Sequence, residues 1–252
     1  MEVHHHAHTA RKKWTHYFWE FLMLFLAVFC GFLAENQREH YIEHQREKQF
    51  MKTLLHDLQN DTASFGRSIH LFQNNVDRFD SLKASIKNPT SAADILNAYK
   101  AATLTHSFSS FNYSDRTIEQ LRNAGNFRLI RKTHVSDSLI EYDRYIRNTY
   151  LTLQHILEQN SLKVLDIQNE IFDYDDFNFL MGKNWQARQA ITPDSFQVSL
   201  QLLNNNQQRL AYYYNTFAMY RNWWQRMANH SKYSKRVATS LIDLVKKEYH
   251  LK

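Results

Sequence analysis

Glycine, proline and cysteine are all scarce in this chain of 252 residues. It contains four Gly and two Pro, whereas average usage is roughly 7% and 5%. Propellers, immunoglobulin-like sandwiches and Gly-rich nucleotide-binding domains need frequent turn residues, so this scarcity excludes them. The single Cys excludes a disulfide framework and Cys-based zinc or iron–sulfur sites. Together with a hydrophobic content of 43%, the composition predicts an all-α fold built from long helices.

The longest apolar run lies near the amino terminus. Residues 21–34 carry no formal charge and are rich in Phe and Leu. Extended back to Trp14, the run reaches the roughly 20 residues that a transmembrane helix needs. A cleaved signal peptide is the alternative, but the bulky Phe32 is unsuited to cleavage after Ala34. We therefore predict an uncleaved transmembrane helix at 14–34.

The flanking charges predict the orientation of this span. Arg11, Lys12 and Lys13 directly precede it, whereas the basic residues that follow are farther away and mixed with Glu. Positive charge favours the cytoplasmic side. We predict a His-rich, basic cytoplasmic tail at 1–13 and an extracytoplasmic body.

One face of the predicted span combines an ionisable side chain with small residues. An ionisable group inside a span indicates function by default, and two small residues four apart let helices approach closely. Two interpretations stay open: a helix–helix seam that encloses the acid, or an acid that reaches the headgroups and pairs with His16. The face consists of Glu20, Leu24, Ala27, Gly31 and Ala34.

Beyond the membrane, the pattern predicts a helical stalk followed by a bundle. Residues 35–50 are polar and helix-forming. From Met51 to Ile86 the apolar residues recur every three or four positions, near the heptad period of a coiled coil, and Asn88-Pro89 ends the helix. Residues 51–252 are predicted to form an extracytoplasmic α-helical bundle.

Turn and cap residues divide the rest of the bundle. Ser91 predicts a helix from Ala92 to about Ala102, and Ser114 or Asp115 predicts one that ends at Gly125. The pattern further predicts a loop with aromatic anchors at 104–113, a long helix from Ser136, a linker at 173–195 and a last helix from about Pro193-Asp194.

Three segments carry residue types that bind metals. The tail holds His4, His5, His6 and His8, which can bind Zn²⁺, Ni²⁺ or Cu²⁺ but lack supporting residues. Residues 40–44 match H-x-x-E-H, although no further carboxylate ligand is evident, and a solvated stalk face is favoured. Residues 173–176 are acidic but lack the Gly and distal Glu of a Ca²⁺ loop. Otherwise we expect no cofactor.

The order of the parts resembles an uncharacterised family of bacterial single-span membrane proteins with a His-rich start. The resemblance rests on residues 1–6, 20–35 and 54–62, and on Gly125-Asn126-Phe127-Arg128-Leu129-Ile130, which is similar to the family's Gly-Asn-x-x-Leu-Ile element. It implies that the His-rich start is native and that the protein lies in the bacterial inner membrane, with its body in the periplasm. It implies no activity.

The Gly-Asn element itself has two interpretations. Gly125 suits the left-handed position after a helix, with Leu129-Ile130 packing the connection that follows. A binding loop built by Asn126, Arg128 and Arg131 is the alternative.

Three functional hypotheses follow from these features. The first is a non-enzymatic assembly or interaction module that contacts membrane lipid and forms a homo-oligomer or joins a membrane protein complex. The second is a ligand-sensing bundle that holds a small molecule near the 104–113 loop and acts through a partner. The third is metal binding by the His-rich tail. Nucleic acid is not expected as a partner on the outer side of a membrane.

Overall fold

The computed structural model of the protein describes residues 14–107, 110–123, 125–196 and 198–251. These residues are all-helical, with 85% helix and no strand, which confirms the all-α prediction. An isolated bridge pairs Phe172 with Leu202. The chain divides into two compact units, one ending at Phe50 and the other beginning at Met51.

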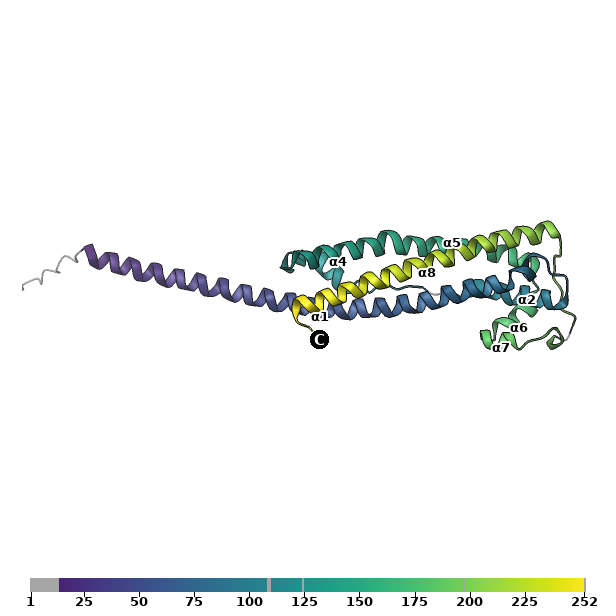
Figure 1. Ribbon diagram of the computed structural model, residues 1–252. Coiled ribbons are helices and arrows are strands. Elements are labelled where there is room, and N and C mark those ends of the chain that lie inside the picture. The colour runs from purple at the N-terminus through teal and green to yellow at the C-terminus, as the bar shows by residue number, and fades with distance from the viewer. Residues whose placement is uncertain (1–13, 108–109, 124, 197, 252) are drawn as a thin grey trace, which may run out of the picture. The chain divides into compact units, whose positions relative to one another are not determined.

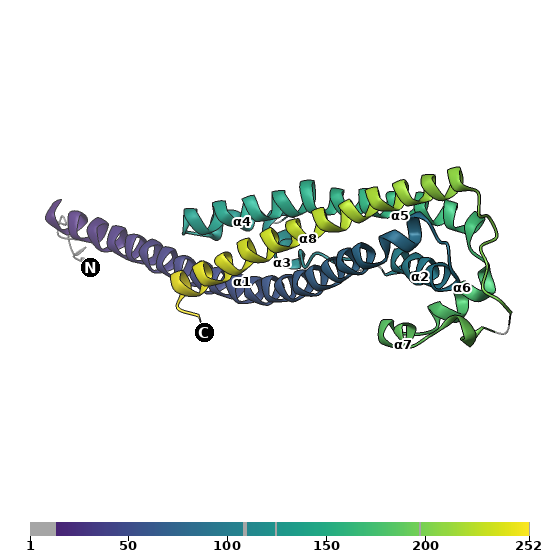
Figure 2. The same ribbon diagram turned by 45° about the vertical axis from the view of Figure 1, so that its right-hand side comes forward.

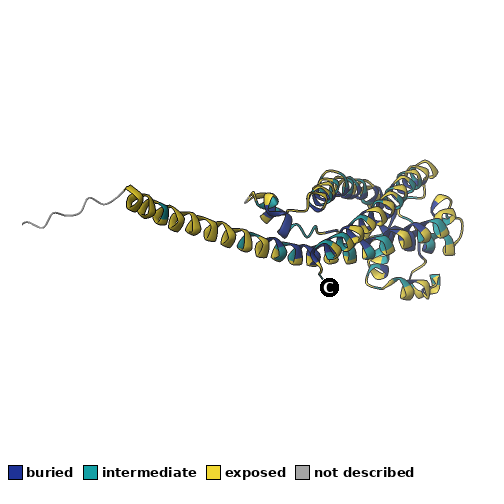
Figure 3. Cartoon of the chain, turned by 60° about the vertical axis from the view of Figure 1, so that its left-hand side comes forward, coloured by how far each residue is buried: buried dark blue, intermediate teal, exposed yellow. Residues whose placement is uncertain are grey.

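The first unit consists of the beginning of helix α1 (Trp14–Lys87). Side chains from Trp14 to Ala34 are almost all exposed (Figure 3). An 18-residue window here has a mean hydropathy of 2.0, so α1 is long and apolar enough to be a candidate membrane span. The helix continues unbroken through the polar residues 35–50, as their helix propensity predicts.

The second unit is a bundle of three long helical segments that lie side by side (Figures 1 and 2). The first is the remainder of α1, which ends at Lys87 before Asn88-Pro89, as predicted. The second long segment consists of α4 (Thr133–Tyr145), η3 (Ile146–Tyr150) and α5 (Leu151–Ile171), and the third is α8 (Gln207–Tyr249). The short helices are α2 (Ala92–Ala102), η1 (Thr103–His106), α3 (Arg116–Asn123), η2 (Asn126–Leu129), α6 (Tyr174–Met181), α7 (Trp185–Gln189) and η4 (Pro193–Ser195).

Aromatic side chains join the three long segments. Phe65 of α1 stacks on Phe111 with ring centroids 4.2 Å apart and meets Tyr150 edge-on at 5.1 Å. Farther along α1, Phe79 meets Phe217 of α8 edge-on at 4.8 Å. Most of the apolar stripe between Met51 and Ile86 is buried. Its three-to-four spacing therefore marks the face that packs into the core.

One helix start differs from prediction because tertiary contacts replace the expected cap. The long helix begins at Thr133, three residues before Ser136, and its N-cap Lys132 makes no side-chain cap bond. Instead Lys132 Nζ lies 3.1 Å from a carboxylate oxygen of Glu248 on α8, and His134 lies 3.4 Å from the other oxygen. These contacts hold the first turn of α4 against α8.

The last helix begins at Gln207, not near Pro193 as predicted. The Asn206 side chain caps it by accepting the backbone N–H groups of Gln208 and Arg209 at 2.9 and 3.2 Å. The preceding segment bonds to other elements: Leu203 N donates to the Ile171 carbonyl at 2.9 Å. The prediction failed because the residues before Asn206 form an irregular strap, in which Leu200 is buried but Val198 and Leu203 are exposed.

The predicted linker at 173–195 is largely helical, since it contains α6 and α7. Asp173 caps α6 by accepting the N–H groups of Asp175 and Asp176 at 2.9 and 3.2 Å. The first acidic residue of 173–176 is therefore a helix cap. In α7, the Trp185 ring lies 4.4 Å from the guanidinium of Arg78 on α1, which docks this short helix onto the bundle.

Candidate functional site

The predicted membrane face is exposed along α1. Glu20, Leu24, Ala27, Gly31 and Ala34 all have exposed side chains or backbone. Glu20 Oε1 lies 3.1 Å from His16 Nε2, one turn earlier, which is the pairing expected for an acid near the headgroups. A Cβ added at Gly31 meets no atom within 4 Å, so no described part of the chain covers this position.

The histidine segments give no metal site in the part of the chain that the structure describes. His4, His5, His6 and His8 lie outside the described residues. In the H-x-x-E-H segment, His40 and His44 lie 3.9 and 3.5 Å from Glu43 and Glu47. The described residues contain no group of three or more His, Cys, Asp or Glu side chains placed to hold a metal ion.

The Gly-Asn element is a helix end. Gly125 has a φ of 63°, the left-handed conformation expected of a residue that follows a helix. Asn126 and Arg128 lie in the short helix η2 that follows, and Arg128 is exposed. Leu129 and Ile130 are buried, as predicted for the packed connection.

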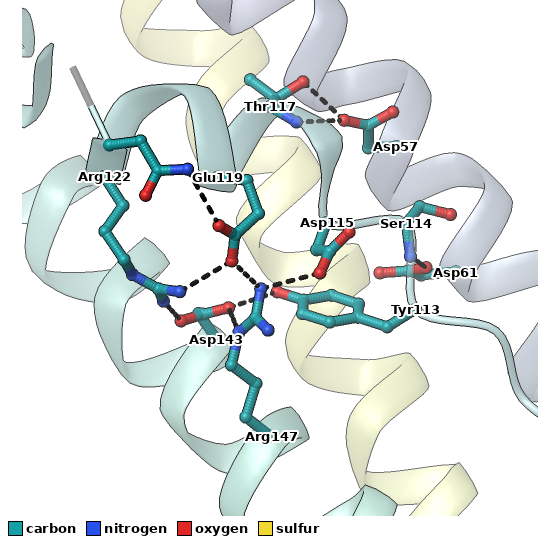
Figure 4. Close-up of polar contacts among 11 residues, drawn as sticks. Asp57, Asp61, Tyr113, Ser114, Asp115, Thr117, Glu119, Arg122, Asp143 and Arg147 are labelled. Carbon is teal, nitrogen blue, oxygen red and sulfur yellow. Dashed lines mark hydrogen bonds and ion pairs between the residues drawn. The ribbon is translucent and has the colours of Figure 1, made fainter.

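A buried polar cluster joins α1, α3 and α4 (Figure 4). Asp57 and Asp61 lie one turn apart on α1 and are only 5% and 1% exposed. Asp57 accepts the backbone N–H of Thr117 at 3.1 Å, together with its hydroxyl. Because Thr117 is in the first turn of α3, whose N–H groups lack helical partners, Asp57 caps α3 from another helix. Asp115 directly precedes α3, as predicted, and its carbonyl accepts the Glu119 N–H at 2.8 Å, but its side chain bonds to Arg147.

Asp61 holds the segment that leads into α3. Its Oδ1 accepts the Ser114 N–H at 3.0 Å, and its Oδ2 accepts the Tyr142 hydroxyl at 2.7 Å. Burial raises the pKa of Asp61, although the bonds from Tyr142 and Ser114 oppose that rise. Burial, followed by the charge of Asp61, raises the pKa of Tyr142 well above its usual range. Tyr142 therefore acts as a neutral hydrogen-bond donor.

The opposite side of the cluster is a set of ion pairs around Arg147 (Figure 4). Its guanidinium donates to Asp143 at 2.8 Å, to Asp115 at 2.8 Å and to Glu119 at 2.6 Å. Arg122 bonds to Asp143 and Glu119 as well. Arg147 lies in η3, a π-helical turn that interrupts the α4–α5 segment. Turns of this type recur at functional sites, and this one carries the residue that links α3 to α4.

The cluster as a whole fixes α3 against α1 and α4. Its carboxylates and guanidinium groups are paired with one another, and its buried acids accept backbone N–H groups. A satisfied polar network of this kind specifies one position for the element that it holds, which here is α3. The sequence pattern did not lead to a prediction of this cluster. The signal that could have indicated it is the spacing of two carboxylates, Asp57 and Asp61, on the buried stripe of α1.

A pocket of about 460 Å³ lies near the other end of the bundle. It includes His106, from the 104–113 segment, and Gln168 of α5. The Gln168 side chain is satisfied internally, accepting from Thr105 at 3.1 Å and donating to Tyr213 at 3.0 Å. The remaining lining residues are Leu165, Asn169, Phe172, Asp173, Tyr174, Phe177 and Leu203.

Hydrogen bonds of Tyr99 connect two segments beside this pocket. The Tyr99 hydroxyl accepts the Asp173 N–H and donates to the Gln201 carbonyl, both at 2.9 Å. It thereby ties the start of α6 to the strap before α8. Burial, with added effects of Asp176 and Asp173, raises the pKa of Tyr99 to about 12.

No family model, curated protein or solved structure matches the chain. The resemblance to single-span bacterial proteins therefore rests on the sequence elements alone.

Proposed function

We propose that this chain is a non-enzymatic, single-pass protein of the bacterial inner membrane. Residues 1–13 lie in the cytoplasm, residues 14–34 cross the bilayer, and the helical bundle lies in the periplasm. The bundle acts as an assembly or interaction module, and copies of the chain associate through the face defined by Glu20, Leu24, Ala27, Gly31 and Ala34.

The observation that carries this proposal is the run of exposed apolar side chains on α1. Soluble proteins rarely expose contiguous apolar surface of this extent, and the candidate span has none of its window buried. Trp14, Tyr17 and Trp19 are exposed at its beginning, where aromatic rings favour the headgroup layer. The small residues Ala27 and Gly31 supply a surface for close helix packing.

Native mass spectrometry of the untagged, full-length protein in mild detergent tests the self-association. We expect a defined homo-oligomer that Gly31→Leu weakens, because a larger side chain separates the helices. Phe29→Trp adds bulk on the opposite side of α1 and is the matched control. A bare monomer, or equal effects of the two variants, would contradict the proposal. A monomer holding a foreign subunit would support the interaction module and refute self-association.

Cysteine labelling tests the orientation. In a Cys30→Ser background, we expect a membrane-impermeant maleimide to label Lys232→Cys in intact spheroplasts and to label Thr9→Cys only after lysis. The reverse pattern would place the bundle in the cytoplasm.

The pocket beside His106 favours a second function, ligand sensing through a partner. The ligand-sensing hypothesis from the sequence names the 104–113 segment, which contributes His106 to the pocket, and a cleft lined by apolar and polar groups is the usual form of a small-molecule site. A small molecule that binds there is expected to raise the unfolding temperature of the full-length protein. A thermal-shift screen of chemically diverse compounds checks this expectation.

A further inference from the structure

The pocket beside His106 has a buried floor and an apolar rim. Phe172 and Gln168 are buried, whereas Tyr174 and Leu203 are 73% and 63% exposed. Large apolar side chains in such positions lose contact with water when a ligand covers them. A volume of about 460 Å³ is within the range of pockets that hold small molecules.

Three aromatic side chains line this space: Phe172, Tyr174 and Phe177. Phe172 is held edge-on by Tyr99 at 4.8 Å and by Tyr213 at 5.5 Å. Phe177 lies 5.1 Å from the His106 ring. Rings held in this way form fixed walls, which suit a flat ligand better than a branched one.

Acidic side chains lie at the pocket and beside it. Asp173 lines the pocket, and Asp175 and Asp176 follow it on α6. Burial, followed by the charges of Asp173 and Asp175, raises the pKa of Asp176. The negative charges of Asp176 and Asp173 also contribute to the raised pKa of Tyr99.

Two basic side chains, His106 and Arg188, lie in this region. Burial, together with the charge of Arg188, lowers the pKa of His106, so its ring is neutral at pH 7. The Arg188 side chain is buried and donates to the carbonyls of Leu180 and Met181 at 2.8 and 3.3 Å. Its guanidinium also donates to the Thr103 hydroxyl at 2.7 Å, so these hydrogen-bond partners are neutral groups of the protein.

We infer that this pocket binds a small organic cation with a flat aromatic body. The rings of the ligand lie against Phe172, Phe177 and Tyr174, and its positive charge lies beside Asp173. Aromatic faces attract cations, and the carboxylate adds direct charge complementarity. This inference rests on the ligand-sensing function proposed above and names the class of ligand.

Two flat tricyclic ions of opposite charge test the inference: 10-methylacridinium and acridine-9-carboxylate. Binding is followed by fluorescence anisotropy with the full-length protein in nanodiscs of zwitterionic lipid, with empty nanodiscs as the blank. We expect saturable binding of the cation with one site per chain, and binding of the anion at least about tenfold weaker.

Two variants locate the site. Asp173→Asn removes the charge but keeps a residue that caps α6 well, so we expect about tenfold weaker cation binding with the fold intact. Asp175→Asn is the matched control, because it removes a neighbouring charge that does not line the pocket, and a change of about twofold or less is expected. Phe177→Ala removes an aromatic wall and weakens both probes. Circular dichroism confirms that each variant is folded.

Each alternative result has a defined meaning. Equal binding of both ions, with loss in Phe177→Ala, would overturn the cation class but support ligand sensing at this pocket. Cation binding that neither Asp173→Asn nor Phe177→Ala weakens would overturn the inference. Absence of saturable binding by either probe would also overturn it, and the thermal-shift screen of neutral compounds would then decide ligand sensing separately.

Discussion

The two units of the chain use the same helix in opposite ways. Before Phe50, the apolar side chains of α1 surround the helix and are exposed, whereas from Met51 onward they form one stripe that is buried. Backbone conformation is the same throughout. The comparison teaches that the distribution of apolar residues around a helix, rather than their number, indicates whether it packs on protein or remains available to another apolar medium.

The largest expected difference between the units comes from removing one aromatic ring from each. Phe65→Ala deletes a buried ring that contacts Phe111 and Tyr150, and we expect a loss of about 3–5 kcal/mol in the free energy of unfolding. Phe25→Ala removes an exposed ring from the first unit and should leave the unfolding of the bundle unchanged. Denaturant titration followed by near-ultraviolet circular dichroism measures both, and equal losses would refute the comparison.

Removal of a carboxylate gives the next largest effect. Asp57→Ala deprives α3 of the cap supplied by α1, and we expect a loss of about 2 kcal/mol because buried N–H and hydroxyl donors lose their acceptor. Glu39→Ala, at an exposed position of the first unit, is the control and should have little effect. Hydrogen exchange gives a sharper test, since the loss of protection should be concentrated in α3. Uniform loss across the bundle would argue against the capping role.

Glycine substitutions should differ in sign between the units. Gly125→Ala places a side chain at a φ of 63° and should cost about 1 kcal/mol, with no steric contribution because nothing lies within 4 Å of the added Cβ. Gly31→Ala, within the helix of the first unit, should be neutral or slightly favourable for the helix. Thermal unfolding measures the first variant, and helicity in detergent measures the second. A stabilising effect of Gly125→Ala would contradict the left-handed assignment.

The smallest expected effect is a change in pH dependence at Asp61. Because its pKa is raised in the folded state, Asp61 favours folding at pH values below its unfolded pKa of about 4, and this contribution is lost as the pH rises through the folded pKa. Asp61→Asn removes the titration. The stability difference between wild type and variant should therefore shift in favour of the variant as pH rises from about 4 to 7. Urea unfolding at several pH values checks this, and a constant difference would contradict it.

Local signals in the sequence were sufficient for part of the fold. Ser91 and Asp94 form the reciprocal cap that begins α2, and Asn88-Pro89 ends α1 because the residue before a proline avoids the helical region. The buried stripe from Met51 to Ile86 follows directly from periodicity. In each case the decisive residues are neighbours in the chain.

The remaining features depend on contacts between distant residues. Thr117 receives its cap from Asp57, 60 residues earlier, and the start of α4 depends on Glu248 of α8. No local pattern identifies such partners. The pocket is similar in this respect, since His106, Phe172 and Leu203 come together only when the strap before α8 is in place.

The π-helical turn η3 has a consequence for how the chain is aligned with relatives. The Leu151 N–H bonds to the Ile146 carbonyl, five residues back rather than four, so this turn contains one additional residue. The buried residues before and after it nevertheless face the same core. A relative with one residue fewer between Tyr145 and Leu151 would thus retain both core faces with an ordinary α-helical turn. In an alignment with such a relative, a one-residue gap belongs at η3. The residues of α4 and α5 would then remain matched on both sides of the gap.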